Sequence, residues 1–485
     1  MRALGARIPR GAYVGAAVLG AALANFLVGA GAATGQRAFT LALLIGLLPA
    51  LLIGFGALVG RHRAVLAWAA FALNLTGLRV LSDPLPLPGG TSIFATDVLV
   101  LLAFGSWLAA RLTRPRGAAV SSVRLSPIFG WPLVLLAVAI AGGVLAGHDR
   151  YGASLIGQPF RIVLYAGIAL ALLEVTPAEA WRAITKVFYV GAFVQSLYAA
   201  YYLATGGAQT DQVSLSTGGT RVLALSIAIY LTGSLVCALL NLELERSAGR
   251  NFLHLGIAGL AVFGILVSFG RTTYAAVALI APLLFFSRRY LRRTVLLMLP
   301  ILAPAVVLVL LVLPQVAPTV IPTLQARLTG TSTQDTNVRW RDLARESALE
   351  GYEDERFRGI GFGRVTEFRI NNQTVTIHGD PHNSYVYLLA GGGLLALGSF
   401  LLLCGLYVVD AVRRLRRALS VESALIVWSL ATWLAFMVNA LAGPIFSNPV
   451  MMLTMWVLMT LPSIVPRRSG GPAATAEAPA VSSGA

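Results

Sequence analysis

The stretch His378-Gly379-Asp380-Pro381-His382-Asn383-Ser384 decides how this chain folds, because it joins a long polar segment to the apolar run Tyr385–Val409. The polar segment, Gln315–Ser384, interrupts an otherwise nearly continuous succession of apolar runs and contains eight arginines and nine acidic residues. Almost everywhere else the charges lie in short connections. A polar block of this size between two membrane spans is where we expect chemistry on a substrate that faces water.

The composition indicates a polytopic membrane protein. Of the 485 residues, 57% are hydrophobic and 12% are charged, and the mean hydropathy is +0.77. Soluble domains contain roughly 25% charged residues. The net charge of +17 does not indicate nucleic-acid binding, because the basic residues separate apolar runs instead of forming one patch with aromatic residues. Cys237 and Cys404 both lie in apolar runs, which argues against a disulfide framework or a cysteine metal site.

The apolar runs predict an all-α fold, a polytopic bundle of about 12–14 transmembrane helices with one large extracytoplasmic loop between late spans. A run of about 20 apolar residues crosses the hydrocarbon layer as a helix. We expect fourteen such runs, at Gly11–Ala33, Ala38–Val59, Ala64–Leu81, Asp97–Leu112, Ile128–Gly147, Arg161–Leu173, Trp181–Leu203, Arg221–Leu242, Phe252–Phe269, Thr272–Phe286, Thr294–Leu313, Tyr385–Val409, Val421–Ala440 and Pro449–Pro462.

These runs divide the chain into four parts. Residues 1–314 hold spans 1–11, residues 315–384 form the large loop, residues 385–466 hold spans 12–14, and residues 467–485 are a disordered cytoplasmic tail. With the amino terminus in the cytoplasm, 23 of the lysines and arginines fall on the inside and 6 on short outside loops. This asymmetry follows the positive-inside rule. It predicts both termini in the cytoplasm and the large loop on the outer face of a bacterial cytoplasmic membrane.

Within the large loop, residues Thr336–Glu350 have the spacing of a short amphipathic helix that could lie on the membrane surface or cover the bundle. Three alternate glycines, Gly359, Gly361 and Gly363, predict a turn; a Gly-x-Gly-x-Gly pattern alone is weak evidence for phosphate binding. In the apolar run that follows the loop, Gly391–Gly393 predicts close helix packing or a bend.

His382 is the first candidate catalytic residue. We expect Asp380 to cap the next helix and Pro381 to occupy its first position, which places His382 in the first helical turn. There the helix dipole disfavours the imidazolium and Asp380 favours it, so the pKa of His382 is expected near neutrality, as suits a general base. The alternative is a histidine that only bonds loop backbone at the membrane interface.

The same stretch also allows a metal site, because His378, Asp380 and His382 are chemically suitable ligands. Residues at this spacing converge on one face of a strand, however, and a helix that starts at Pro381 breaks that geometry. We therefore expect no metal and no other cofactor.

Two arginines are candidates for binding an anionic group. Arg221 and Arg271 each lie where an outer loop meets an apolar run, without an acidic neighbour in the sequence. Arginine near the bilayer persists where it is paired, hydrated or used. Two guanidinium groups bind pyrophosphate oxygens well. The alternative is that both side chains reach the lipid headgroups. Arg161 is a weaker third case.

Several of these motifs resemble the O-antigen ligase and O-antigen polymerase superfamily of bacterial envelope glycan transferases. The resemblance rests on Ser268-Phe-Gly-Arg271, Arg339-Trp340-Arg-Asp-Leu, Gly359-Ile-Gly-Phe-Gly363 and the run His382-Asn383-Ser-Tyr385 that continues to Gly391-Gly-Gly. The motif order is also similar, with the large outer loop late in the chain. The ligases of this superfamily usually have about twelve spans.

The resemblance implies a metal-independent, inverting glycosyl transfer on the outer face, from a polyprenyl pyrophosphate-linked glycan to a sugar hydroxyl of a glycan or glycolipid acceptor. By carry-over, His382 is the catalytic base, and Arg221 and Arg271 bind the donor pyrophosphate. Further possible substrate-binding residues are Arg161, Arg339, Asn383 and Tyr385. Three alternatives stay open: polymerisation of repeat units, transport of a lipid-linked oligosaccharide, and a rival base among Glu353, Asp354 and Glu355. The expected partners are donor, acceptor and membrane lipids, not nucleic acid.

Overall fold

The computed structural model describes residues 68, 85–86, 92–103, 126–151, 157–172, 175–205, 223, 225–245, 247–268, 270–287, 336–370, 373–378 and 380–466. The predicted spans Gly11–Ala33, Ala38–Val59 and Thr294–Leu313 lie outside these residues, as does Ala64–Leu81 apart from Trp68. The predicted tail, residues 467–485, also lies outside them.

Six of the described helices are long and apolar enough to cross a membrane. They are α6 (Trp131–Tyr151), α9 (Pro177–Thr205), α10 (Leu225–Leu244), α11 (Ala248–Val267), α16 (Ser384–Leu415) and α17 (Ser420–Ala440). Each coincides with a predicted span, which confirms the fold class of a polytopic helical membrane protein. The total number of spans in the chain stays a prediction.

The other described elements are shorter. Two of them, α12 (Arg271–Ser287) and α18 (Pro449–Thr460) with the 3-10 turn η5 (Leu461–Ile464), match predicted spans. The predicted span Arg161–Leu173 falls on a chain of short helices. These and the remaining elements outside the loop are β1 (Leu85–Pro86), β2 (Ser92–Ile93), η1 (Pro127–Phe129), α7 (Gly157–Leu164), η3 (Tyr165–Ile168) and α8 (Ala169–Leu172).

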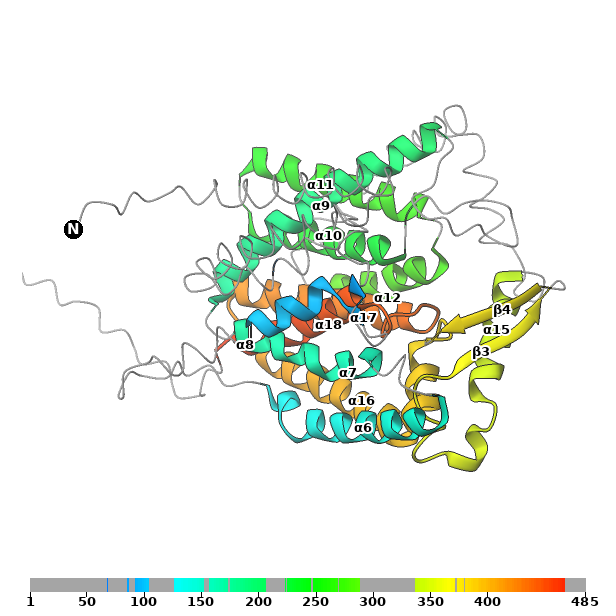
Figure 1. Cartoon of the computed structure of the whole chain (residues 1–485). Coiled ribbons are helices and arrows are strands. Elements are labelled where there is room, and N and C mark those ends of the chain that lie inside the picture. The colour runs from blue at the N-terminus through cyan, green and yellow to red at the C-terminus, as the bar shows by residue number, and fades with distance from the viewer. Residues whose placement is uncertain are drawn as a thin grey trace, which may run out of the picture.

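Helix α17 lies in the middle of the described bundle. It packs against α9, α10 and α12 on one side and against α16 and α18 on the other, as Figure 1 shows. Because both sides of α17 contact other helices, its large side chains, such as Trp428 and Phe436, are fully buried. This helix is therefore the element against which the two groups of helices are positioned.

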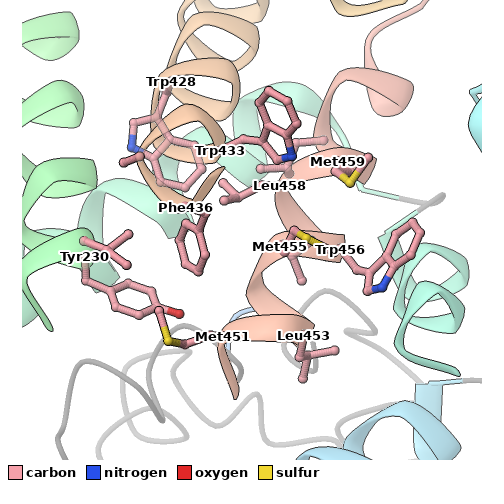
Figure 2. Packing of buried hydrophobic residues seen from close by; sticks show 14 of the residues in the cluster. Tyr230, Trp428, Trp433, Phe436, Met451, Leu453, Met455, Trp456, Leu458 and Met459 are labelled. Carbon is pink, nitrogen blue, oxygen red and sulfur yellow. The ribbon is translucent and has the colours of Figure 1, made fainter. Parts of the chain in front are cut away.

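Aromatic side chains fill the core around α17 (Figure 2). The ring of Trp428 meets that of Phe188 from α9 edge to face, with centroids 4.9 Å apart. The indole N–H of Trp428 donates to the carbonyl of Gly233 at 2.8 Å, and that of Trp456 donates to the carbonyl of Ile162 at 2.7 Å. Polar groups in the hydrocarbon region need internal partners, so these bonds fix which helices lie side by side.

Helix α16 breaks at Gly393, where φ is 69° and ψ is −167°. A left-handed residue cannot continue the helix, so nearby backbone groups need other partners. The loop supplies them: Ile360 donates its N–H to the carbonyl of Ala390, and Leu394 donates its N–H to the carbonyl of Arg356, both at 2.8 Å. A Cβ on Gly393 would lie 2.2 Å from the carbonyl oxygen of Phe357. The predicted bend is therefore present, and the loop closes against it.

The glycine turn inserts one aromatic ring between α6 and α16. Gly359, Gly361 and Gly363 all have positive φ, which confirms the predicted turn. Phe362 is buried and donates its N–H to the carbonyl of Gly143 at 3.0 Å. A Cβ on Gly391 would lie 2.2 Å from the ring of Phe362. The loop is thus bonded into the bundle, close to the start of α16.

The rest of the loop forms a small lobe at one end of the bundle (Figure 1). Helix α15 (Thr336–Leu349) confirms the predicted amphipathic helix, and the 3-10 turn η4 (Tyr352–Glu355) follows it. Strands β3 (Val365–Ile370) and β4 (Gln373–His378) then form an antiparallel hairpin in which Phe368 faces Val375. This hairpin was not predicted from the sequence. It returns the chain to His382 at the start of α16.

Candidate functional site

His382 lies in the connection between β4 and α16. Its backbone φ is 58°, and among the described residues it is the one non-glycine residue with positive φ. The half-buried imidazole packs against the indole of Trp340 on α15, with ring centroids 4.6 Å apart and planes inclined by 75°. Trp340 in turn meets Phe368 on β3 at 6.0 Å. Helix α15 and the hairpin therefore hold one side of the imidazole.

The predicted start of α16 is wrong by three residues. The helix begins at Ser384, and the side chain of Asn383 caps it by accepting the N–H groups of Tyr385 and Val386, both at 3.1 Å. Asp380 is therefore not the cap, and Pro381 is not the first helical residue. The physical reason is the left-handed backbone of His382, which no right-handed helix accommodates. His382 therefore lies before the first turn of α16, whereas the predicted effect of the helix dipole assumed that it lies within that turn.

Asp380 is instead the centre of a buried turn. Its Oδ1 accepts the N–H of Asn383 at 3.0 Å, and its Oδ2 accepts the hydroxyl of Ser384 at 2.6 Å. The residue is only 3% exposed, and burial raises the pKa of the Asp380 carboxyl to about 7, although its hydrogen bonds oppose the shift. This carboxyl therefore changes its ionisation close to neutral pH.

Arg271 is the first residue of α12 and is partly exposed. The turn before it is fixed by Ser268, whose hydroxyl accepts the N–H of Gly270 at 3.3 Å. The next residue, Thr272, donates its hydroxyl to the side-chain oxygen of Asn439 on α17 at 2.7 Å. The positive end of the α12 dipole and the Arg271 guanidinium thus lie at the same end of α12, which favours an anionic ligand there.

The last turns of α17 bring the two predicted regions together. Asn439 bonds Thr272 beside Arg271, and the carbonyl of Met437 accepts the hydroxyl of Tyr385 from the first turn of α16 at 3.1 Å. From α15, Arg345 donates to the carbonyl of Leu441 at 3.3 Å. The start of α12, the start of α16 and the lobe therefore meet at the end of α17. A substrate that bridges Arg271 and His382 would lie over this end.

The other predicted substrate-binding residues have different surroundings. Arg221 lies outside the described residues. Arg161 is 8% exposed and donates its Nε–H to Asp97 at 2.9 Å, where Tyr165 also donates its hydroxyl at 2.6 Å. Arg339 is exposed on α15, one residue before Trp340. The structure thus leaves Arg339 exposed next to Trp340 on α15 and gives Arg161 a buried carboxylate partner.

The loop acids that could rival His382 as a base lie on η4. Glu353 pairs with Arg356, and Glu355 pairs with Arg150 at the end of α6, while Asp354 is exposed. This places Glu355 beside the end of α6. Among the described residues no three metal-ligating side chains cluster, and the side chain of His378 is not among those described.

Sequence reasoning missed Ser384, Thr272 and Asn439, which connect the site. Each lies within one or two residues of a predicted site residue or at the end of a predicted span, so position alone could have drawn attention to them. Their partners are distant in the sequence, however. No local pattern predicts a bond between Thr272 and Asn439.

Comparison with known proteins gives one family. Residues 256–401 match the family model described as O-antigen ligase. No curated protein matches the chain. The matched segment runs from α11 through the lobe to the break in α16, and so contains Arg271, Trp340 and His382. The match confirms the resemblance predicted from the motifs.

Proposed function

We propose, from the match of residues 256–401 to the O-antigen ligase family model, that the chain is a glycosyltransferase that moves a glycan from a polyprenyl pyrophosphate donor to a sugar hydroxyl. We place the reaction at the lobe end of the bundle, on the outer face of a bacterial cytoplasmic membrane. One observation carries the proposal: the end of α17 is bonded both to the residue after Arg271 and to the first turn of α16 after His382.

In the proposed reaction the acceptor hydroxyl oxygen attacks the anomeric carbon of the donor glycan. The bond from that carbon to the pyrophosphate oxygen breaks, and polyprenyl pyrophosphate leaves with the electron pair. His382 accepts the hydroxyl proton, because histidine is the side chain that most often acts as a general base. One displacement at the anomeric carbon inverts its configuration.

The leaving group gathers negative charge on the pyrophosphate as the bond breaks. We assign its stabilisation to Arg271, supported by the amino-terminal end of α12, and to Arg221. Fixed cationic groups stabilise such a charge without reorganising during the reaction. Arg161 is left out of this donor site because its guanidinium is bonded to the buried Asp97.

The three other candidate residues take supporting roles in this proposal. Asn383 caps α16 and Tyr385 bonds α17, so each holds the segment that carries His382. Arg339 is exposed beside Trp340, and we propose that it contacts the acceptor. A glycan acceptor presents hydroxyl oxygens, and often carboxylates or phosphates, to such a guanidinium.

The test uses purified protein in liposomes with a polyprenyl pyrophosphate-linked glycan and candidate acceptors. Wild-type protein should release polyprenyl pyrophosphate and form a larger glycan. His382→Ala should lower kcat by about 10²- to 10⁴-fold, the usual contribution of a general base. Arg271→Ala should weaken donor binding by about 10- to 100-fold through loss of a charged hydrogen bond. Arg358→Ala, which removes an exposed arginine from the same loop, is the matched control and should retain activity.

Several results would count against these assignments. Turnover by His382→Ala at the wild-type rate would remove His382 as the base, and unchanged donor affinity of Arg271→Ala would remove that residue from the donor site. Loss of activity in EDTA that a divalent metal restores would favour the alternative site at His378, Asp380 and His382. Product length separates a single ligation from polymerisation. Movement of the glycolipid between leaflets without transfer would indicate a transporter.

A further inference from the structure

The buried turn from Asp380 to Ser384 encloses His382, and its hydrogen bonds take no part in the transfer chemistry proposed above. Asp380 accepts the N–H of Asn383 through one carboxyl oxygen at 3.0 Å and the hydroxyl of Ser384 through the other at 2.6 Å. These two bonds close the chain around His382, whose φ is 58°. A non-glycine residue keeps a left-handed backbone only where its surroundings fix it. The Asp380 carboxyl supplies that constraint.

Ser384 connects this turn to a distant part of the chain. It is fully buried, and its oxygen accepts the N–H of Ile445 at 2.9 Å and that of Phe446 at 3.2 Å. The carbonyl of Gly443 lies 3.1 Å from the same hydroxyl. These residues belong to the connection between α17 and α18. Ser384 therefore fixes the turn that carries His382 to the end of α17, where the first turn of α12 is also bonded through Thr272.

Helix capping does not explain these bonds. Asn383 already accepts the first two free N–H groups of α16 with its own side-chain oxygen. Asp380 bonds the N–H of Asn383 and the hydroxyl of Ser384, both on the far side of His382 from its own position, and its carboxyl also meets the backbone N–H groups of His382 and Phe446. Its bonds therefore span His382 and hold the residue in place, whereas the helix end is satisfied without them.

We infer that Asp380 and Ser384 are positioning residues for His382. Asp380 sets the left-handed turn that presents the imidazole against Trp340, and Ser384 fixes that turn to residues 443–446. The expected loss of catalytic rate rests on the proposed function, whereas the expected loosening of the imidazole does not. Loss of the Asp380 bonds should therefore loosen His382 even in protein that is not turning over.

The first experiment measures how fast diethylpyrocarbonate modifies His382 in the full-length protein in lipid nanodiscs, with fragment mass spectra assigning the modified histidine. Asp380→Ala should speed the modification about threefold or more, because the turn opens more often. Asp380→Asn should react within about twofold of the wild-type rate. Its amide oxygen still accepts the N–H of Asn383, the bond that spans His382, while the hydroxyl of Ser384 turns its hydrogen to the carbonyl of Gly443 and keeps both lone pairs for the N–H groups of Ile445 and Phe446.

The matched control is Asp354→Asn, the same chemical change at an exposed acid in the same loop. It should leave the modification rate of His382 unchanged. Equal rates for wild type, Asp380→Ala and Asp380→Asn would overturn the inference. A misfolded Asp380→Ala protein would react fast at all its histidines, so His254, which is buried in α11, reports on global unfolding and must stay slow.

The second experiment measures transfer by the same variants. A misplaced base lowers kcat by up to about 100-fold and leaves KM for the donor unchanged. We expect this pattern for Asp380→Ala, with kcat of Asp380→Asn restored to within about threefold of wild type. An Asp380→Asn variant that melts no lower than wild type but is as inactive as Asp380→Ala would overturn the inference, because the hydrogen bonds of Asp380 would then not be what positions His382. If wild-type protein shows no transfer, the proposed function fails, and the modification rates still decide the role of Asp380.

Discussion

At the scale of single residues, the contact between Trp340 and His382 links the lobe to the proposed chemistry. An indole against the edge of an imidazole restricts the rotamers of the imidazole and contributes about 0.5–1.5 kcal/mol beyond its burial. The two rings come from α15 and from the turn before α16, which are 42 positions apart in the sequence. The orientation of the base therefore depends on the fold of the loop.

Replacing Trp340 tests this dependence. Trp340→Ala should lower kcat about tenfold, the factor that corresponds to the upper end of such an aromatic contact. Trp340→Phe should retain most of the activity because it keeps an aromatic face. Phe357→Ala, which removes an aromatic ring that is 72% exposed in the same loop, is the control. Equal kcat for wild type and Trp340→Ala would show that the indole does not orient the base.

The buried carboxyl of Asp380 predicts how stability depends on pH. Burial raises its pKa from 3.8 to about 7, so the folded state holds the proton more tightly than the unfolded state. The contribution of Asp380 to stability is therefore fully present below about pH 4 and is lost as the pH rises to about 7. Asparagine does not titrate and avoids this loss. Asp380→Asn should thus gain melting temperature relative to wild type progressively between pH 4 and pH 7.

Thermal melts of both proteins across this range check the prediction. The exposed Asp354→Asn should differ from wild type by the same small amount at every pH, because its carboxyl is solvated in both states. A gain for Asp380→Asn that shrinks between pH 4 and pH 7 would contradict the sign of the pKa shift.

The sequence pointed to Asp380 and Asn383 as possible caps of α16, but it did not predict the hydrogen bonds that each of them makes. Asp380 and Asn383 both precede good helix positions, and either is a suitable cap. The choice between them depends on the backbone of His382, which is set by Ser384 and its partners at residues 443–446. Such partners are about sixty positions away, and no local rule reveals them.

At the scale of elements, the break in α16 and the glycine turn of the loop form one interlocked unit. Backbone groups freed by the break are bonded by the loop, and the ring of Phe362 fills the space between α6 and α16. Non-helical backbone is tolerated within a membrane bundle where its polar groups find such partners. The loop is therefore held in place by α16, close to His382.

Gly393→Ala tests this unit. The new Cβ would meet the carbonyl of Phe357, and the positive φ is unfavourable for alanine, so we expect a loss of roughly 2 kcal/mol or more in stability. Gly398→Ala lies five positions further on the same helix and meets no atom within 4 Å. It should be neutral or slightly stabilising because alanine favours helix. Equal melting temperatures for the two variants would contradict the packing at the break.

The hairpin shows why the elements of the loop were harder to predict than the spans. Within the strands 365–370 and 373–378, residues 368–370 and 374–378 alternate apolar and polar side chains on either side of a turn that contains two asparagines, which is a hairpin signal. This signal extends over only twelve residues of a long polar segment. It is therefore weaker than the signal of a membrane span, which extends over about twenty apolar residues. The amphipathic helix α15 was predicted because its spacing extends over four turns.

At the scale of the whole molecule, hydropathy predicted the described spans well, because a helix that crosses a membrane must be apolar along its length. It did not predict which helices are neighbours. A membrane helix is apolar on every face, so periodicity does not distinguish the face that meets lipid from the face that meets protein. Contacts such as Trp428 with Phe188 decide that arrangement through shape and through indole hydrogen bonds.

The proposed chemistry requires the lobe to lie outside the cytoplasm, and the distribution of arginines predicts this orientation. The two native cysteines, Cys237 and Cys404, are buried within helices, so single new cysteines report sidedness without removing them. A membrane-impermeant maleimide added to intact cells should label Asp354→Cys in the lobe. It should label Arg417→Cys, which follows α16, only after the membrane is opened.

Asp354 and Arg417 are both exposed, so the protein itself shields neither new cysteine from the maleimide. A difference in labelling therefore reports on which side of the membrane each cysteine lies. Unmodified protein should remain unlabelled under both conditions. The reverse pattern would place the lobe in the cytoplasm, where Arg413, Arg414 and Arg416 would then face outward against the charge rule. Transfer on the outer face would be ruled out by that result, because Arg271 and His382 lie at the lobe end and would face the cytoplasm with it.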